Sequence, residues 1–386
     1  MKQKKMKLTI LGATGSIGAS TADVMLRHPD KFETYALVGH RNSQRMLELA
    51  EQLKPEIVVM TDGDAIAELQ GKLPQGVLLH EGMDAAVAAA SEASVDMVMA
   101  AMVGSAGLPA ALAAVHAGKR VGLANKECLV TAGRIFMQAA KDCGADVVPV
   151  DSEHAAVHQA LLGHDHGSIR RIILTASGGP FRDRDPASLV NVTPEEAIAH
   201  PNWSMGAKIS VDSATMMNKA LELIEARWLF DMPADKLSAI IHPQSIVHAM
   251  VEYRDGSVLA QLAEPDMRSP IAYALQTGER LEAGIPWLDL AKTGRLDFQA
   301  VDTERFPAMR LVQTVMQGND TLAISMNAAN EVANQAFRDR KLGFMDIVRT
   351  VEAVLAKVEN IPVDSLDDVW SHDREARRLA QEMIVL

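Results

Sequence analysis

Short apolar runs alternate with helical patterns over the first 150 residues, and no other feature of the sequence limits the possible folds as strongly. Clear apolar runs lie at residues 7–11, 34–38, 57–60 and 97–102, and segments with helical periodicity separate most of them. Strands that alternate with helices pair in parallel and are covered by helices on both faces. The sequence therefore predicts an α/β fold whose N-terminal domain, residues 1–150, is a Rossmann-like doubly wound parallel sheet.

The pattern changes after residue 150. Strand-like runs and a long helical stretch at 215–230 follow without regular alternation, which predicts an α+β catalytic and connective domain over residues 151–277. Residues 278–306 contain glycine and proline with little periodicity, and we interpret them as a linker. The remaining residues, 307–386, have a helical pattern and predict a C-terminal helical domain.

Composition excludes several classes of protein. A chain of 386 residues with 48% apolar and 23% charged residues is neither disordered nor fibrous. Its net charge of -12 argues against a nucleic-acid partner, although a phosphorylated small molecule needs only a local basic pocket. Two cysteines and no apolar signal segment predict a cytoplasmic protein. The uncharged residues 97–115 are broken by glycine and proline, so we expect a strand, a turn and a buried helix rather than a membrane span.

A glycine-rich turn directly follows the first apolar run. Gly12, Gly15 and Gly18 have GxxGxxG spacing between the first predicted strand and the first predicted helix. Dinucleotide folds hold a pyrophosphate against backbone N–H groups at this position. A tight turn with no ligand would also use these glycines, so the spacing alone leaves both interpretations open.

The second predicted strand ends in Gly39-His40-Arg41-Asn42, without the acidic residue that usually binds the ribose of NAD. A guanidinium can pair with a 2′-phosphate instead, so this segment favours NADP over NAD. The alternative is that Arg41 is an ordinary solvated arginine.

Two carboxylates follow the last predicted strand of the first domain, at Asp151 and Glu153. In an extended chain, residues two apart face the same side, so both could converge on one hard cation such as Mg²⁺ or Mn²⁺. A capping region at the start of the next helix is an equal alternative for this segment.

The second domain contains groups suited to a phosphate. A predicted strand runs into a Ser-Gly-Gly loop that begins at Ser177, where a hydroxyl and backbone N–H groups could approach an anion. Helical spacing places Asn218, Lys219 and Glu222 on one face of the helix at 215–230. These three side chains could hold a phosphate beside a metal, or they could simply face solvent.

Two further segments have alternative interpretations. In the loop at 200–206, Trp203 is either a lid that excludes water from a site or a cap on the core. Residues 125–128 follow a strand and open a helix at the sheet edge where ligands bind. There, Lys126 is an active-site cation or a surface lysine, and Cys128 fits a small buried thiol better than a nucleophile.

Eight motifs together are much more specific than any one of them, and they occur in this order: GATGSIG, NKECLV, VDSEH, TASGGPF, HPNWSMG, ISVDSATMMNKALELIEARWLF, HPQSIVH and AEPDMRSPIAY. On these motifs, which extend over nearly the whole chain, the protein closely resembles the 1-deoxy-D-xylulose 5-phosphate reductoisomerase family. The resemblance implies NADPH and a divalent metal, Mg²⁺ or Mn²⁺, as cofactors, and a homodimer. The chain departs from the family pattern at four positions, none of which is a proposed ligand: Cys128, Ala155, His158 and Ala220.

The resemblance also implies roles for the residues that match these motifs. The metal ligands, which with Lys126 form the catalytic set, would be Asp151, Glu153 and Glu222. The same acids would lie against the substrate, together with Lys126, Ser152, Ser177, His200, Trp203 as a lid, Ser213, Asn218, Lys219 and His248. NADPH would be held by Gly12, Thr14, Gly15, Ser16, Ile17, Gly39, His40, Arg41, Asn42, Asn125, Glu127 and Gly206.

The implied reaction rearranges a small phosphorylated sugar, 1-deoxy-D-xylulose 5-phosphate, and reduces the product with NADPH to 2-C-methyl-D-erythritol 4-phosphate, an isoprenoid precursor. Two alternatives are an aspartate-semialdehyde-type NADP dehydrogenase, which needs a cysteine nucleophile, and a non-catalytic NADP-sensing regulator. The residues without the resemblance predict only a metal-dependent NADP oxidoreductase that acts on a phosphorylated substrate.

Overall fold

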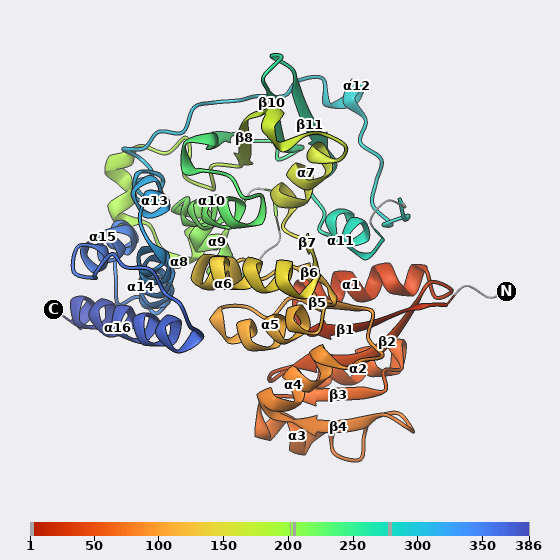
Figure 1. Ribbon diagram of the computed structural model, residues 1–386. Helices are drawn as coiled ribbons and strands as arrows, with labels where there is room; N and C mark the ends of the chain where they lie inside the picture. The colour runs from red at the N-terminus through yellow and green to blue at the C-terminus, as the bar shows by residue number, and fades with distance from the viewer. Residues whose placement is uncertain (1–3, 201, 204–205, 277–279, 386) are drawn as a thin grey trace. The chain divides into compact units, whose positions relative to one another are not determined.

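The computed structural model of the protein describes residues 4–200, 202–203, 206–276 and 280–385 (Figure 1). The chain forms two compact units, and each is assembled from separate stretches of sequence. The first unit comprises Met1–Cys128, Phe136–His158 and Asp266–Trp287. The second unit comprises Leu129–Ile135, Gln159–Pro265 and Leu288–Leu386.

The first unit is built on a parallel sheet with the strand order β4-β3-β2-β1-β5-β6-β7. Met97, Val98 and Met99 of β5 are consecutive and have no exposed surface; because successive residues of a strand face opposite sides, the core lies on both faces of the sheet. The Rossmann-like prediction is therefore confirmed. The strands are β1 (Met6–Leu11), β2 (Phe32–Gly39), β3 (Ile57–Met60), β4 (Leu78–Glu81), β5 (Met97–Ala100), β6 (Arg120–Leu123) and β7 (Asp146–Pro149).

Helices connect these strands. Helix α1 packs against α2 and α11, whereas α4 packs against α5. The uncharged stretch at 97–115 forms β5, a short 3-10 turn and α5, as the sequence predicts. Within the described chain, no helix is both long enough and apolar enough to span a membrane. The connecting helices are α1 (Ser16–Arg27), α2 (Ser43–Leu53), α3 (Gly63–Leu69), α4 (Gly82–Ser91), α5 (Leu108–His116) and α6 (Glu127–Cys143). Helix α7 (Ser152–Leu161) follows β7, and α11 (Arg268–Leu275) comes from later in the chain.

The strand order reverses between β1 and β5, and the loops that follow these two strands approach each other closely. Gly12 leaves β1 with φ 80°, and a Cβ atom at this position would lie 2.4 Å from the carbonyl oxygen of Ala101, which follows β5. Only glycine permits this approach. Ligands of doubly wound sheets bind beyond the carboxyl ends of the strands at such a reversal.

The second unit contains a mixed sheet with the strand order β11-β10-β8-β9. Strand β8 (Ile169–Ala176) pairs in parallel with β9 (Leu237–Ile241) and antiparallel with β10 (Val247–Tyr253), which pairs antiparallel with β11 (Val258–Leu262). Helix α10 (Met217–Leu229) packs against β8 and β9 and follows α8 (Pro194–Ile198) and α9 (Ala207–Ala214). These elements confirm the predicted α+β character.

The C-terminal part is helical, as predicted, and α14 is its centre, since it contacts α9, α10, α13, α15 and α16. Between α11 and α13, the only helix in the described residues is the short α12 (Leu290–Thr293). The other helices are α13 (Ala308–Gln317), α14 (Asp320–Arg338), α15 (Phe344–Leu355) and α16 (Leu366–Val385).

The sequence predicts a helix at 215–230, but the helix begins two residues later, at Met217. Met216 has a left-handed conformation, with φ 61°, and separates α9 from α10. The hydroxyl of Thr215 accepts a hydrogen bond from the Met217 N–H at 3.3 Å, which supports this break. Consequently Ser213 lies on one helix, while Asn218 lies on the next.

Gly18→Ala should destabilise the protein, because the new Cβ would lie 2.3 Å from the carbonyl oxygen of Ala13, a backbone atom with little room to move. We expect the free energy of unfolding to fall by about 1–3 kcal/mol, the usual cost of overpacking. Gly63→Ala is the control, because a Cβ there meets no atom within 4 Å. Chemical denaturation checks both, and equal stabilities for the two variants would contradict the packing described for Gly18.

Candidate active site

The glycine turn surrounds the N-terminus of α1. Gly15 is the N-cap residue, and no side chain caps the helix. The Gly15 N–H donates to the Gly12 carbonyl oxygen at 3.0 Å, which closes the turn. An uncapped helix N-terminus offers N–H donors and a partial positive charge, so this turn fits a pyrophosphate. Three further predicted cofactor residues lie in the turn or in the first turn of α1: Thr14, Ser16 and Ile17.

The end of β2 gives Arg41 a partner that the sequence did not predict. Arg41 is exposed, and its Nε donates to the Asp62 carboxylate at 3.0 Å. This hydrogen bond holds the pKa of the Asp62 carboxyl below its usual value. A 2′-phosphate at Arg41 would therefore share the guanidinium with Asp62. Asn42, the residue after Arg41, caps α2 through its side chain. Gly39 ends β2, and His40 lies between Gly39 and Arg41.

Asn125 follows β6, and its side chain is buried. Its amide nitrogen donates to the carbonyl oxygens of Met102 and Gly104, the latter at 2.9 Å. Its amide oxygen has no hydrogen-bond partner in the described structure. A buried acceptor without a donor is costly, so this oxygen fits a position that a cofactor would contact. Glu127 is also buried and begins α6.

The prediction of an extended segment at Asp151 and Glu153 is wrong. Strand β7 ends at Pro149, and the Ala155 N–H donates to the Asp151 carbonyl oxygen at 2.8 Å. Asp151 therefore precedes α7, and Glu153 lies in its first turn, where the helix dipole stabilises a carboxylate. The helix-start alternative describes this backbone correctly.

The side chains of this segment nevertheless form an acidic cluster within the first unit. A carboxylate oxygen of Asp151 lies within 4.8 Å of a ligand atom of Glu153 and of His154. The Lys126 ammonium lies 2.5 Å from the Asp151 carboxylate. The Ser152 hydroxyl donates to the Glu153 carboxylate at 2.5 Å. Lys126 is thus an ion-paired, largely buried cation rather than a solvated surface lysine.

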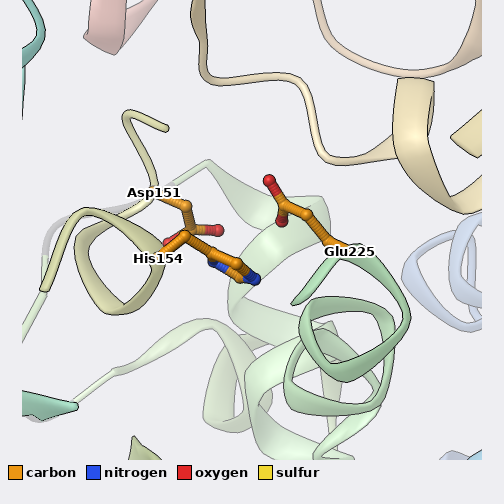
Figure 2. Close-up of side chains that lie close together, drawn as sticks. All are labelled: Asp151, His154 and Glu225. Carbon is orange, nitrogen blue, oxygen red and sulfur yellow. The ribbon is translucent and has the colours of Figure 1, made fainter. Parts of the chain in front are cut away.

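Sequence reasoning missed two residues of ligating type, His154 and Glu225. Figure 2 shows His154 with Asp151 at the start of α7, and Glu225 on α10. His154 and Glu225 have no exposed surface. The available clues were the position of His154 beside Glu153 and the spacing of Glu225, one helical turn after Glu222.

The second unit brings Ser177 and His200 together. The His200 Nδ1 accepts the backbone N–H groups of Asn202 and Trp203 at 3.2 and 3.0 Å, so the proton of the neutral ring is on Nε2. Nε2 then donates to the Ser177 hydroxyl oxygen, 2.9 Å away, and the Gly179 N–H donates to the same oxygen at 3.1 Å. Because both lone pairs of the Ser177 hydroxyl oxygen accept hydrogen bonds, the hydroxyl proton can be donated to an anion.

The Ser-Gly-Gly loop packs directly against the end of α9. A Cβ on Gly179 would lie 2.8 Å from the carbonyl oxygen of Ser213. Ser177 and Ser213, two of the predicted phosphate residues, therefore belong to neighbouring segments of the second unit.

On α10, Asn218 and Lys219 both donate to the carboxylate of Glu222. The solvent-facing alternative does not hold for Lys219 and Glu222, because both side chains are buried. The helix therefore presents an amide, an ammonium and a carboxylate in one connected group.

Trp203 is linked to two predicted site histidines. Its backbone N–H donates to His200, and its ring centroid lies 6.2 Å from that of His248, a buried residue of β10. Gly206 precedes α9 and is exposed. Of the predicted lid, Pro201, Ser204 and Met205 lie outside the described residues.

Family models match most of the chain. A model described as 1-deoxy-D-xylulose 5-phosphate reductoisomerase matches residues 8–133. A model for the C-terminal domain of the same protein matches residues 147–230. A DXP reductoisomerase C-terminal domain model matches residues 262–379.

Curated relatives and solved structures agree with these models. The 1-deoxy-D-xylulose 5-phosphate reductoisomerase of Burkholderia lata is 52% identical over 384 residues, which cover 98% of this chain and 96% of the relative. The structure of the Zymomonas mobilis reductoisomerase in complex with NADPH has 45% identity and a TM-score of 0.93, with 99% of each chain covered. A DOX-P reductoisomerase in complex with NADPH, fosmidomycin and magnesium has 40% identity and a TM-score of 0.92, with 99% of this chain and 98% of that chain covered.

The His200 environment predicts a pH dependence of stability. Burial, and then the nearby Arg182 guanidinium, lower the pKa of His200 to about 4. In the unfolded chain His200 has a pKa of about 6.5, so between pH 6.5 and 4 it binds a proton there but not in the folded protein. His200 therefore lowers the free energy of unfolding increasingly as the pH falls from 6.5 towards 4. His200→Gln lacks this effect.

Urea unfolding of both proteins at pH 7.5, 6 and 5 measures the effect. Between pH 7.5 and 5, the wild-type protein should lose more free energy of unfolding than His200→Gln does. Parallel losses in the two proteins would contradict the buried, neutral state of His200.

Proposed function

The chain belongs to the 1-deoxy-D-xylulose 5-phosphate reductoisomerase family, and from this membership we propose which residues carry out the reaction. The activity is the NADPH- and divalent-metal-dependent conversion of 1-deoxy-D-xylulose 5-phosphate to 2-C-methyl-D-erythritol 4-phosphate. The observation that carries this conclusion is the 52% identity over 98% of the chain.

The substrate phosphate binds in the second unit, at Ser177, Ser213, Asn218 and Lys219. The geometry of Ser177 supports this assignment, because its hydroxyl oxygen accepts two hydrogen bonds and its proton is left for an acceptor. Lys219 supplies the positive charge and Asn218 a neutral donor. The phosphate lies away from the reacting carbons, so these contacts hold the substrate in a fixed orientation for the reaction.

One divalent cation is bound by the carboxylates of Asp151, Glu153 and Glu222. Carboxylate oxygens are the ligands that Mg²⁺ and Mn²⁺ prefer, and the donor set therefore fits the cation. When bound, the cation supplies Lewis-acid stabilisation of negative charge on the substrate oxygens.

NADPH binds along the carboxyl edge of the parallel sheet and supplies a hydride. The uncapped α1 N-terminus and the unpartnered oxygen of Asn125 both fit such a ligand. Contacts come from Gly12, Thr14, Gly15, Ser16, Ile17, Gly39, His40, Arg41, Asn42, Asn125, Glu127 and Gly206.

Five residues complete the site. His200 lies near the substrate phosphate, and Lys126 and Ser152 contact the reacting carbonyl and hydroxyl end of the substrate. Trp203 closes over the substrate, and His248 lines the pocket. The buried state of Cys128, which has no exposed surface, argues against the semialdehyde dehydrogenase alternative, since that enzyme needs a thiol that reaches its substrate.

We further propose a four-part domain division, a homodimer and a cytoplasmic location. The division is 1–150, 151–277, 278–306 and 307–386. Strand β11 supports a homodimer, because it is a sheet edge with exposed Val258 and Leu259 that a second copy could cover. The free, exposed thiol of Cys143 supports a reducing compartment.

The direct test is NADPH oxidation, followed at 1-deoxy-D-xylulose 5-phosphate concentrations that span saturation, with and without Mg²⁺ or Mn²⁺. We expect oxidation only when the sugar phosphate and a metal are both present. Metal-independent oxidation, or no oxidation with any metal, would overturn the proposed function.

Arg41→Ala should raise the KM for NADPH by about tenfold, as expected for the loss of a charge-assisted contact, and should leave the KM for NADH nearly unchanged. Asp62→Asn is the matched control, because it frees the guanidinium from its partner and should leave NADPH binding equal or tighter. Steady-state kinetics with both cofactors check this. Equal changes in the two KM values after Arg41→Ala would remove the 2′-phosphate assignment.

Glu222→Gln should give a folded protein that still binds NADPH, because the change keeps the side-chain size and removes only one charge. We expect the Mg²⁺ concentration for half-maximal activity to rise by at least about tenfold, and most turnover to be lost. Glu252→Gln is the control, since Glu252 is a largely buried carboxylate paired with Arg171 outside the proposed site. Wild-type metal dependence in Glu222→Gln would show that Glu222 is not a ligand.

A further inference from the structure

A buried carboxylate connects α9 to the C-terminal helical region. Asp212 of α9 is only 1% exposed. Its Oδ1 accepts hydrogen bonds from the side-chain amides of Asn330 and Asn334, at 2.9 and 2.8 Å. Its Oδ2 lies 3.1 Å from the Lys208 ammonium. Both amides come from α14, more than a hundred residues later in the chain.

The surroundings of Asn334 determine how its amide is oriented, whereas the Asn330 amide oxygen has no hydrogen-bond partner among the described residues. Asn330 and Asn334 have no exposed surface. Asn334 also donates to the Lys208 carbonyl oxygen at 3.0 Å and accepts from the Arg338 Nε at 3.0 Å, so its nitrogen faces α9 and its oxygen faces away. Burying a carboxylate is costly unless donors surround it, and α14 supplies two of the donors to Asp212.

Asp212 directly precedes Ser213, one of the proposed phosphate residues. The Ser213 carbonyl oxygen accepts the Met216 N–H at 3.1 Å. Met216 has the left-handed conformation that ends α9 and begins α10, a conformation that costs about 1–2 kcal/mol for a residue other than glycine. Such a backbone persists only where its surroundings hold it. The position of α9 therefore determines where Ser213 and the first turn of α10 lie.

We propose that Asn330 and Asn334 of α14 are positioning residues for the substrate phosphate. By holding Asp212, they fix Ser213 of α9 and, through the turn at Met216, the start of α10. This inference rests on the proposed function, in which Ser213, Asn218 and Lys219 bind the phosphate. It assigns the C-terminal helical region a part in substrate binding that acts through Asp212 rather than through contact with the substrate.

Asn327 distinguishes this role from a general contribution to stability. It lies on the same helix, has no exposed surface, and donates to Glu331 of α14 itself at 3.3 Å. Asn327→Leu and Asn330→Leu therefore make the same chemical change at equal burial. Only the second removes a donor to Asp212.

The experiment measures KM for 1-deoxy-D-xylulose 5-phosphate, KM for NADPH and the inhibition constant of inorganic phosphate in the wild-type protein and both variants. In Asn330→Leu, the sugar phosphate KM and the phosphate inhibition constant should rise together by about tenfold, as expected for one lost hydrogen bond to a charged group. The KM for NADPH should stay within about twofold, a change worth less than one hydrogen bond. In Asn327→Leu, all three constants should remain near the wild-type values.

Asn330→Ser is measured in parallel, because its hydroxyl ends one bond short of the asparagine amide nitrogen and so lies out of hydrogen-bond reach of Asp212, without added apolar bulk; it should follow Asn330→Leu. If Asn330→Leu does not fold, Asn330→Ser decides the result. Equal effects of the Asn327 and Asn330 changes, or wild-type phosphate constants in Asn330→Ser, would overturn this inference while the proposed function stands. An inactive wild-type protein would instead overturn the proposed function and, with it, this inference.

Discussion

Charge that is removed from water must be balanced by nearby groups, and the candidate site depends on this constraint more than on any other. Asp212, Lys219 and Glu222 are at most 3% exposed, and each has an oppositely charged partner within its own unit. Breaking a buried pair leaves an uncompensated charge, which costs far more than a surface pair contributes. Each buried charge of the site therefore depends on its own partner, and removing one member of a pair leaves the other uncompensated.

This constraint explains how an acidic protein can bind an anionic substrate. The net charge of -12 belongs to the whole chain, whereas the proposed phosphate residues contribute hydroxyl, amide and ammonium donors. The proposed metal ligands are carboxylates, each with a donor beside it: Lys126 for Asp151, Ser152 for Glu153 and Lys219 for Glu222. Opposite charges thus alternate over short distances within each unit, and the second unit also contains the neutral Ser177–His200 pair.

Local patterns in the sequence predicted the parallel sheet, the glycine turn and most helices, because apolar periodicity and glycine spacing act over a few residues. They did not predict the break at Met216, since a left-handed residue is held by its tertiary surroundings. They left the backbone of Glu153 open, because an acid–serine–acid segment is compatible with a strand end and with a helix start, and only the structure selects the helix start. The Asp212–Asn330 bond joins residues 118 positions apart, and neither residue has a local signature. Roles for individual residues came from the family motifs rather than from periodicity.

We propose above that the carboxylates of Asp151, Glu153 and Glu222 bind one divalent cation, and the rest of the site is arranged around it. The most direct measurement is an anomalous difference map from crystals of the protein grown with Mn²⁺ and NADPH. We expect one strong manganese peak within coordination distance of a carboxylate oxygen of each of these three residues. A manganese peak on other side chains, with none at these three, would contradict it.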